Sequence, residues 1–421
     1  MTKTGSRKLR SGKNRIAVGL GRAAKRALAT GKHKGAVLRS GKVVQPEREL
    51  PVKHVTDVLV VGGGPAGVAA AIAARRTGAN VALMERYGYF GGLFTGGMVL
   101  LLQGTYARLG NGDNIQVARG FNAEVIKRLM GLGAGCLIRE QGHDPTADPE
   151  AAKYVLGEMI RESGVKVFLH CWGVDAIMEG ANIRGAVFES KSGRQAIRAK
   201  IVIDASGDGD IYAVAGADYQ AHAKQIGLVH RLLNAAGEPG PKTPIPNVRW
   251  NGWLVAEKAD ALDVDVLTRL EMDYRKQIWE HARDLRQQPG NENMFLLDVA
   301  AQLGIRISRL LKGVAQCGFM KAGTSKDVVG VASHYAGGEK LAYIPYGALL
   351  PRRVDNLLVA GRCVSMDLQT AELVRLIPAC FTTGQAAGVA AALALKDNCA
   401  PRNVDVARLQ QVLKDQGAYL V

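Results

Sequence analysis

Residues 56–97 read TDVLVVGGGPAGVAAAIAARRTGANVALMERYGYFGGLFTGG, and this stretch decides the fold. A short apolar run, residues 57–61, leads directly into Gly62, Gly64 and Gly67, which have the spacing G-x-G-x-x-G. Between a strand and a helix, the first glycine permits a tight turn and the second lets the backbone approach a pyrophosphate. The third lets the helix pack close to the strand. The spacing therefore predicts a turn that binds a dinucleotide.

The residues that follow complete this unit. Pro65 stands in the first helical turn, where its missing N–H removes no helical hydrogen bond, and residues 66–74 form an alanine-rich helix. The positive end of its dipole would face the phosphates. A strand over 80–84 ends in Glu85, 18 positions past Gly67, where a carboxylate can accept hydrogen bonds from a ribose. An ordinary βαβ turn is the alternative, but it would not need all these features in register.

The positive charge is concentrated at the N-terminus. The chain has 421 residues and a formal net charge of +17, and residues 1–54 contribute +13, with 15 Lys and Arg against two Glu. No acidic residue precedes Glu47, as in a transit peptide or in an arm that binds nucleic acid or another anionic partner. The simpler interpretation is a solvated, disordered extension.

Composition also bears on location and metal content. The apolar run 16–20 is too short for a secretory signal, and we expect no stretch of about 18 apolar residues to span a membrane. We therefore expect a cytoplasmic protein, with organelle import through the basic extension as the alternative. The six cysteines form no C-x-x-C pair and have no histidine at zinc spacing, so we expect reduced thiols and no metal site.

Downstream patterns predict further elements. Asp148 and Pro149 are typical of a helix start. Strands separated by glycine turns predict a β-meander over 173–200, after which an apolar strand, 201–203, ends in the small-residue turn 204–210. Such a turn is typical of ligand sites in α/β sheets. We expect helices over 119–130, 149–162, 264–287 and 382–395 and strands over 165–170, 173–177, 183–189 and 195–200.

The C-terminal part contains a second strand-glycine-helix unit. Strand 357–360 is followed by Gly361 and Arg362, and Pro378 leads into a helix rich in Ala and Gly. This unit can bring a second helix N-terminus to the same ligand. We predict an α/β fold with a parallel sheet and a β-meander, interrupted by a smaller α+β substrate domain. The predicted boundaries are 1–54 for the extension, 55–217 and 346–421 for the nucleotide-binding domain, and 218–345 for the inserted domain.

Taken together, the N-terminal glycine turn, residues 204–209 and the run NLLVAGRCVS through RLIPACFTTGQAAGVAAALAL resemble the FAD-dependent oxidoreductases of the glutathione-reductase-like superfamily. The resemblance covers residues 55–421 and extends distantly to fumarate reductase and succinate dehydrogenase flavoproteins. It implies FAD as cofactor, and no His-Thr pair for covalent attachment occurs near residues 90–97, so we expect noncovalent FAD. The inserted domain lacks a convincing dicarboxylate-binding set of His and Arg, which argues against fumarate-type activity.

The resemblance also implies positions for the cofactor. Gly62, Gly64 and Gly67 would hold the diphosphate. Glu85 would bind the adenosine ribose and the Val174 main chain the adenine. Residues 204–208 and Gly361 would line the ribityl chain. The turn before Gly384 would lie near the isoalloxazine. The expected FAD-binding residues are Gly62, Gly64, Pro65, Ala66, Gly67, Glu85, Arg86, Gly91, Gly92, Val174, Asp204, Gly207, Asp208, Gly361, Arg362 and Gly384.

For catalysis we predict hydride transfer between FAD and a small or medium organic substrate. Arg375 and Arg309 would polarise or bind an anionic group, and His334, Tyr346 or Tyr335 would exchange a proton. His334 is favoured because histidine titrates near neutrality. The electron acceptor is not evident from the sequence, and a homo-oligomer is left open. Two other functions remain: a flavoprotein that modifies RNA with the help of the basic tail, and a non-catalytic FAD-binding subunit.

Overall fold

The computed structural model of the chain describes residues 36–108, 114–138, 144–237, 243–252, 254–319, 326–334 and 341–420. The chain divides into two compact units, Met1–Glu49 and Leu50–Val421. The described part of the first unit contains a hairpin of β1 (Val37–Arg39) and β2 (Lys42–Val44). Residues 1–35, most of the predicted extension, lie outside the described residues, as does Tyr335. The first strand of the second unit begins at Val52, within the range predicted as extension.

The centre of the second unit is a mixed sheet, which confirms the predicted α/β class. In the described chain it has seven strands, in the order β10-β11-β12-β3-β4-β9, with β23 pairing with β12. The strands β3, β4, β9, β12 and β23 are parallel, whereas β10, β11 and β12 form the predicted antiparallel meander. The bounds are β3 (Val52–Val61), β4 (Val81–Glu85), β9 (Lys166–Leu169), β10 (Trp172–Glu179), β11 (Asn182–Ser190), β12 (Gly193–Asp204) and β23 (Leu357–Val359).

Strand β12 corrects one detail of the prediction. The stretches 195–200 and 201–203 were expected as separate strands, but they form one strand that ends at Asp204. Its first half pairs with β11 in the meander, and its last residues pair with β23. Along most of its length the other edge pairs with β3. One strand thus joins segments from both ends of the chain.

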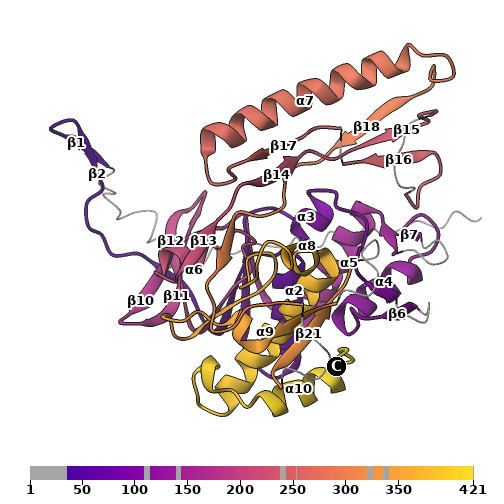
Figure 1. Cartoon of the computed structure of the whole chain (residues 1–421). Coiled ribbons are helices and arrows are strands. Elements are labelled where there is room, and N and C mark those ends of the chain that lie inside the picture. Colours follow the sequence, from indigo (N-terminus) through magenta and orange to yellow (C-terminus); the bar gives the residue numbers. More distant parts are fainter. Residues whose placement is uncertain are drawn as a thin grey trace, which may run out of the picture. The chain divides into compact units, whose positions relative to one another are not determined.

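Two helices from the two ends of the chain also pack against each other, outside the sheet. Helix α2 (Pro65–Arg76) packs against α9 (Ile377–Lys396), and Figure 1 shows both at the centre of the body. A Cβ at Gly384 or Gly388 would clash with the backbone of Ala66 or Ala70, so glycine permits this close packing. The expected start of the second helix at Thr382 was too late, because Pro378 lies in its first turn. The other helices here are α3 (Gly92–Thr95), α4 (Phe121–Gly131), α5 (Pro149–Ser163), α6 (Asp210–Val214), α8 (Ala371–Val374) and α10 (Val406–Asp415).

Helix α9 also meets the length and composition expected of a membrane-spanning helix. Its mean hydropathy is 1.3, and it is the one such helix in the described ranges. The prediction that no such stretch exists overlooked this alanine-rich segment. In the fold, 94% of its apolar window is buried, as its packing on α2 requires.

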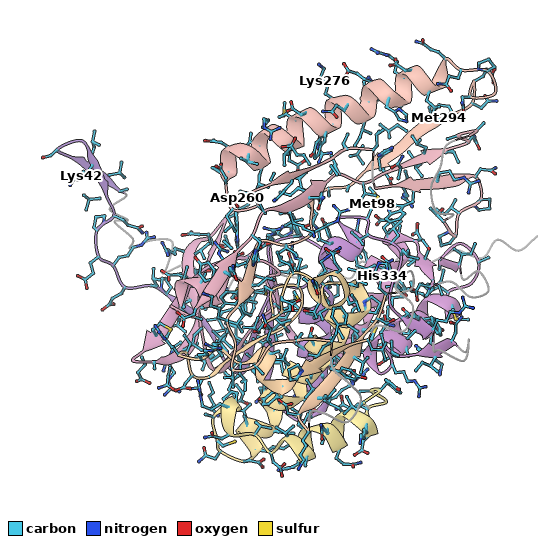
Figure 2. The ribbon with its side chains drawn as sticks, in the orientation of Figure 1. Lys42, Met98, Asp260, Lys276, Met294 and His334 are labelled. Atoms are coloured by element: carbon cyan, nitrogen blue, oxygen red, sulfur yellow. The ribbon has the colours of Figure 1, made fainter. Side chains whose placement is uncertain are left out.

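The described residues between 224 and 305 form a cap of two small sheets and a long helix. Sheets β17-β14-β19 and β16-β15-β18 lie beneath α7 (Val264–Arg286), as Figure 1 shows. Met98 and Met294, labelled in Figure 2, belong to separate apolar clusters of this region. The boundary 218–345 stays a prediction, and β21, within it, packs on α9 rather than in the cap. The cap strands are β14 (Lys224–Gly227), β15 (His230–Leu233), β16 (Val248–Asn251), β17 (Ala256–Ala259), β18 (Phe295–Val299) and β19 (Gly304–Ile305).

Shorter paired strands complete the body. Their bounds are β5 (Tyr106–Arg108), β6 (Asn114–Gln116), β7 (Leu137–Ile138), β8 (Thr146–Ala147), β13 (Tyr219–Ala221), β20 (Arg309–Leu311), β21 (Val328–Ala332) and β22 (Ala342–Pro345). The pair β7-β8 falls in the stretch 131–148, which was expected to be entirely loop. Asp148 caps α5 as predicted, because its side chain accepts hydrogen bonds from the backbone N–H groups of Glu150 and Ala151.

His230 makes the cap sensitive to pH. Its side chain is fully buried in β15, and neither ring nitrogen has a hydrogen-bond partner among the described residues. Burial lowers its pKa to about 4, His281 adds to this effect and Asp298 opposes it. The unfolded chain therefore binds a proton below its ordinary pKa of 6.5 while the folded chain does not, so stability is lost as pH falls from 6.5 towards 4.

We expect His230→Leu to remove this loss. Between pH 7 and pH 5 the wild-type free energy of unfolding should fall by about 2 kcal/mol more than that of the variant. At pH 7 the variant should be at least as stable, since it removes two buried unpaired polar atoms. Urea unfolding at both pH values measures the difference, and equal pH dependence in the two proteins would contradict the assignment.

Candidate functional site

The predicted glycine turn is built as its sequence suggests. Gly62 has a φ of +101° and donates its N–H to the oxygen of Met84 at 2.9 Å, and a Cβ there would clash with Ala205. A Cβ at Gly67 would clash with the oxygen of Gly62. Gly67 therefore lets the helix pack closely on the strand, as its place in the motif predicts, and its contact with the diphosphate stays a prediction.

Gly64 is different because the space beside it is open. A Cβ at this position would meet no atom within 4 Å, and Gly64 caps α2 without a side-chain hydrogen bond. The N–H groups of the first helical turn, beginning after Pro65, therefore face this space. A helix N-terminus without a cap is suited to a diphosphate.

Glu85 is held by the backbone at the end of β4. Its Oε2 accepts a hydrogen bond from the N–H of Gly63 at 2.6 Å and its Oε1 from the N–H of Tyr87 at 2.9 Å. Burial raises the pKa of the Glu85 carboxyl, and these two N–H groups oppose that shift. Glu85 lines the cavity described below, as a ribose ligand must.

Arg86 and Trp172 lie next to Glu85. The Arg86 guanidinium carbon is 4.8 Å from the centre of the Tyr87 ring and 5.7 Å from that of Trp172, which is 55% exposed. Trp172 and Gly173 line the hollow here, whereas Val174 is not among the described lining residues, and its contact with the adenine stays a prediction. Trp172 was missed, although an exposed tryptophan at the start of a strand beside the glycine turn was a usable signal.

The second turn, after β12, is organised by Asp204. This fully buried carboxylate accepts hydrogen bonds from the Ser206 hydroxyl at 2.7 Å and from the N–H of Tyr212 at 2.8 Å. Burial raises its pKa. Asp204 therefore shapes the turn and caps α6, and it is not among the described cavity-lining residues, whereas Gly207 and Asp208 are. Its predicted contact with the ribityl chain stays a prediction.

Two arginines fix this turn. Arg362 donates a hydrogen bond to the Asp208 carboxylate at 2.9 Å. Arg309 donates to the main-chain oxygen of Asp208 at 2.9 Å and to the Asp210 carboxylate at 3.1 Å. Burial and the neighbouring carboxylates of Asp208 and Asp204 raise the pKa of Asp210 to about 6. Arg309 lines the cavity, but its hydrogen bonds indicate that it holds the turn.

The C-terminal unit reaches the same place. Gly361 has a φ of +88°, donates its N–H to the Thr383 hydroxyl at 2.9 Å, and lies so close to Ala66 that a Cβ would be 2.9 Å from it. Cys380 lines the cavity, and burial raises the pKa of its thiol to about 12. Gly384, predicted near the flavin, is instead a glycine of the α2 and α9 contact and is not among the described lining residues.

These elements surround a cavity of about 540 Å³. The glycine turn, Glu85, the turn after β12 and the Gly361 turn contribute to it, as does the start of α7. Gly92 lines it, while Gly91, with a φ of +104°, donates to the Gly63 oxygen and supports the turn. An open helix N-terminus and a carboxylate at the end of the second strand fit the diphosphate and ribose of FAD.

A second cavity, of about 300 Å³, adjoins the first under the cap. The residues that line both cavities are Leu93, Ile305, Arg362, Arg375 and Ile377. Trp250 and Gln103 line the second cavity but not the first, and Gln103 belongs to no motif in the sequence. The two cavities are therefore adjacent at these five residues.

The predicted catalytic residues lie in different surroundings. Arg375 stands between the cavities, donates to Glu372 at 2.5 Å, and has a buried Nε without a partner in the described ranges. His334, labelled in Figure 2, lies 2.9 Å from the Gln103 amide, and burial followed by Arg375 lowers its pKa. Tyr346 is buried and donates to the Pro401 oxygen at 2.7 Å, so its assignment to proton transfer was wrong.

Comparison with known proteins identifies the family. A family model described as FAD dependent oxidoreductase matches residues 57–232 and 228–413. A geranylgeranyl bacteriochlorophyll reductase-like protein of Thermoplasma acidophilum has 14% identity, with 86% of this chain and 84% of that chain covered and a TM-score of 0.47. The p-nitrophenol 4-monooxygenase of Pseudomonas putida has 12% identity, coverages of 86% and 85%, and a TM-score of 0.46. No curated protein matches. Since the family match spans both glycine turns, the chain belongs to the FAD-dependent oxidoreductase family and uses FAD as its cofactor.

Proposed function

We propose that this oxidoreductase transfers a hydride between noncovalently bound FAD and an organic substrate held in the 300 Å³ cavity. The observation that carries the proposal is the shared wall of the two cavities, formed by Leu93, Ile305, Arg362, Arg375 and Ile377. A non-catalytic FAD-binding subunit would not need a cavity at this place. The RNA-modifying alternative depends on the basic tail, residues 1–54, of which residues 1–35 lie outside the described residues.

The chain's own residues bind the cofactor and exclude water from it. FAD, when bound, supplies a ring that accepts or gives a hydride. The N-terminus of α2 would hold the diphosphate, Glu85 the ribose, and Arg86 with Trp172 the adenine end. Arg362, held by Asp208, would line the middle of the cofactor.

Arg375 is the residue best placed to act on the substrate. Arg375 lines both cavities, and its buried Nε has no hydrogen-bond partner among the described residues. A substrate oxygen that accepts from it would be oriented and polarised. The Nε of Arg309 is likewise without a partner among the described residues, but Arg309 is less suited to this role because it lines the larger cavity and not the smaller one.

His334 is not among the described residues that line the 300 Å³ cavity, but it contacts one that is. It contacts the Gln103 amide, which does line the cavity, and its lowered pKa keeps it neutral at neutral pH. A neutral imidazole can accept a proton or orient the amide. We propose that His334 positions Gln103 and accepts a proton only if the substrate reaches beyond that amide.

Substitution at these two positions tests the proposal. We expect Arg375→Gln to slow anaerobic flavin reduction by roughly 100-fold, because it removes a donor placed in the reacting region. His334→Gln should slow it less. The substrate comes from a screen of acids, alcohols and amines for flavin bleaching, and stopped-flow absorbance measures the rate. Arg353→Gln, at an exposed pair with Asp218, is the control and should behave as wild type. Unchanged reduction rates in both test variants would show that the assignment is wrong.

A further inference from the structure

A groove of about 760 Å³ lies at the edge of the central sheet where its parallel strands begin. Val81 and Lys166, the first residues of β4 and β9, line it. The FAD cavity lies at the opposite edge, where the strands end, as in other α/β sheets. Thr56 in the groove is six residues, roughly 20 Å, before Gly62 along β3. The groove is therefore separate from the flavin site.

One wall of the groove is an unpaired edge of β3. This strand begins six residues before its pairing with β4, which starts at Val58, whose N–H donates to the oxygen of Asn80 at 3.0 Å. Alternate residues of a strand turn their backbone groups to the same edge, so those of His54 and Thr56 also face the side of β4. No described strand pairs with residues 52–57 on that side. This stretch can therefore accept one further strand.

Positive charge surrounds the open edge. Two pairs of lining residues neutralise each other, since Lys200 contacts Asp57 at 2.8 Å and Arg184 contacts Glu179 at 2.7 Å. Three further lining cations have no carboxylate partner among the described residues, and they are Arg75, Lys166 and Arg198. This surplus of positive charge is complementary to an acidic ligand.

Two of these three cations are held in place by their surroundings. The Nη1 of Arg75 donates to the oxygen of Ala79 at 3.3 Å, just after α2. The Lys166 ammonium lies 5.7 Å from the centre of the Phe168 ring, and the same ring lies 5.6 Å from that of His54. Since His54 belongs to the open edge, the unpaired backbone and an unpaired cation lie close together.

We propose that an extended acidic segment of a partner protein binds here as an additional strand on β3, with its Asp or Glu side chains paired to the three cations. In recognition by strand addition, backbone pairing gives affinity and the side chains select the partner. The open edge 52–57 spans roughly 20 Å, which matches a segment of about six residues. The N-terminal extension is not complementary, because residues 1–54 carry a net charge of +13. A nucleic acid would match the charge but has no peptide backbone to extend the sheet.

Fluorescence anisotropy with labelled octapeptides tests the proposal on the FAD-loaded full chain. We expect a peptide of alternating Glu and Thr to bind at least about tenfold more tightly than one of alternating Glu and Pro. The two peptides have equal charge, but proline cannot donate a hydrogen bond to a sheet. A peptide of alternating Lys and Thr should not bind, because its charge has the same sign as that of the groove.

Variants of the groove separate charge from backbone pairing. Lys166→Gln combined with Arg198→Gln should weaken binding of the Glu-Thr peptide by about tenfold. Arg269→Gln combined with Arg353→Gln is the matched control, because it removes the same charge from exposed ion pairs outside the groove, and it should bind as wild type does. His54→Pro removes an N–H of the open edge and should reduce the preference for Glu-Thr over Glu-Pro to about threefold or less. The flavin content of each variant reports its folding.

Four results would overturn the proposal. Absence of Glu-Thr binding would do so directly, and equal affinity for the Glu-Thr and Glu-Pro peptides would mean that only charge is recognised. A uridine octanucleotide that binds more tightly than the Glu-Thr peptide at the same salt concentration would assign the groove to nucleic acid. Self-association of the wild type that the Lys166 and Arg198 double variant abolishes would assign it to a second copy of the chain.

The proposal and hydride transfer can fail separately. Because the groove lies at the sheet edge opposite the flavin site, the Lys166 and Arg198 double variant should reduce its flavin at the wild-type rate. Peptide binding is measured without turnover, so it is observed whether or not an organic compound bleaches the flavin.

Discussion

Gly64→Ala is expected to weaken FAD binding by about 100-fold while leaving the fold intact. The backbone at Gly64 has φ −67° and ψ −175°, which alanine adopts freely, and its methyl would meet no atom within 4 Å. The methyl would instead occupy the space through which a diphosphate approaches the N-terminus of α2. Losing two charge-assisted hydrogen bonds at about 1.5 kcal/mol each corresponds to a factor of ~100 in affinity.

Fluorescence titration of apoprotein with FAD measures this change. Gly157→Ala is the matched control because Gly157 lies within α5, where a methyl also meets no atom within 4 Å. It should leave FAD affinity unchanged and add up to about 1 kcal/mol of stability. Gly67→Ala should fail to fold properly, since its methyl would clash with the oxygen of Gly62. Wild-type FAD affinity in Gly64→Ala would mean that the diphosphate lies elsewhere.

Arg231→Met is expected to lower the free energy of unfolding by about 3–5 kcal/mol. Arg231 is 5% exposed in β15 of the cap, and it pairs with Asp148 at 3.1 Å and with Asp298 in β18. Asp148 is the N-cap of α5 in the nucleotide-binding part. The substitution would leave that buried carboxylate without its cation, and it would remove an ionic contact between the cap and the rest of the body.

A double-mutant cycle separates the lost pair from lost packing. Asp148→Asn keeps the ability to cap α5, so Arg231→Met combined with Asp148→Asn should recover part of the stability. Arg269→Met, at an exposed pair with Glu257, is the control and should cost less than about 1 kcal/mol. Urea unfolding of the FAD-loaded proteins gives the values. An Arg231→Met midpoint equal to that of Arg269→Met would show that the buried pair contributes little.

The backbone of the site could be predicted because its signals are local. Gly62, Gly64 and Glu85 mark positions where backbone conformation or a strand end is dictated by residue type. The N-cap at Asp148 was predicted for the same reason. The meeting of both chain ends followed from two similar strand-glycine-helix units, and the pairing of β3 and β23 with β12 confirms it.

The failed assignments depended on which way a side chain or helix face points in three dimensions. Gly384 was predicted to lie near the flavin, but it lets α9 pack closely against the Ala66 backbone of α2. Tyr346 was predicted as a residue that could exchange a proton, yet its hydroxyl donates to a backbone oxygen 55 residues away in sequence. Gln103 carries no motif, and only the tertiary fold brings it to His334, 231 residues later. Trp172 carries no motif either, and only the fold brings it beside Arg86 at the cavity.

The cofactor content of the purified full-length chain tests the central claim most directly. Acid precipitation followed by chromatography of the supernatant identifies the released flavin and gives its ratio to protein. The account predicts yellow protein that releases FAD, at about one molecule per chain after reconstitution. Colourless protein that gains no flavin on incubation with FAD would contradict it.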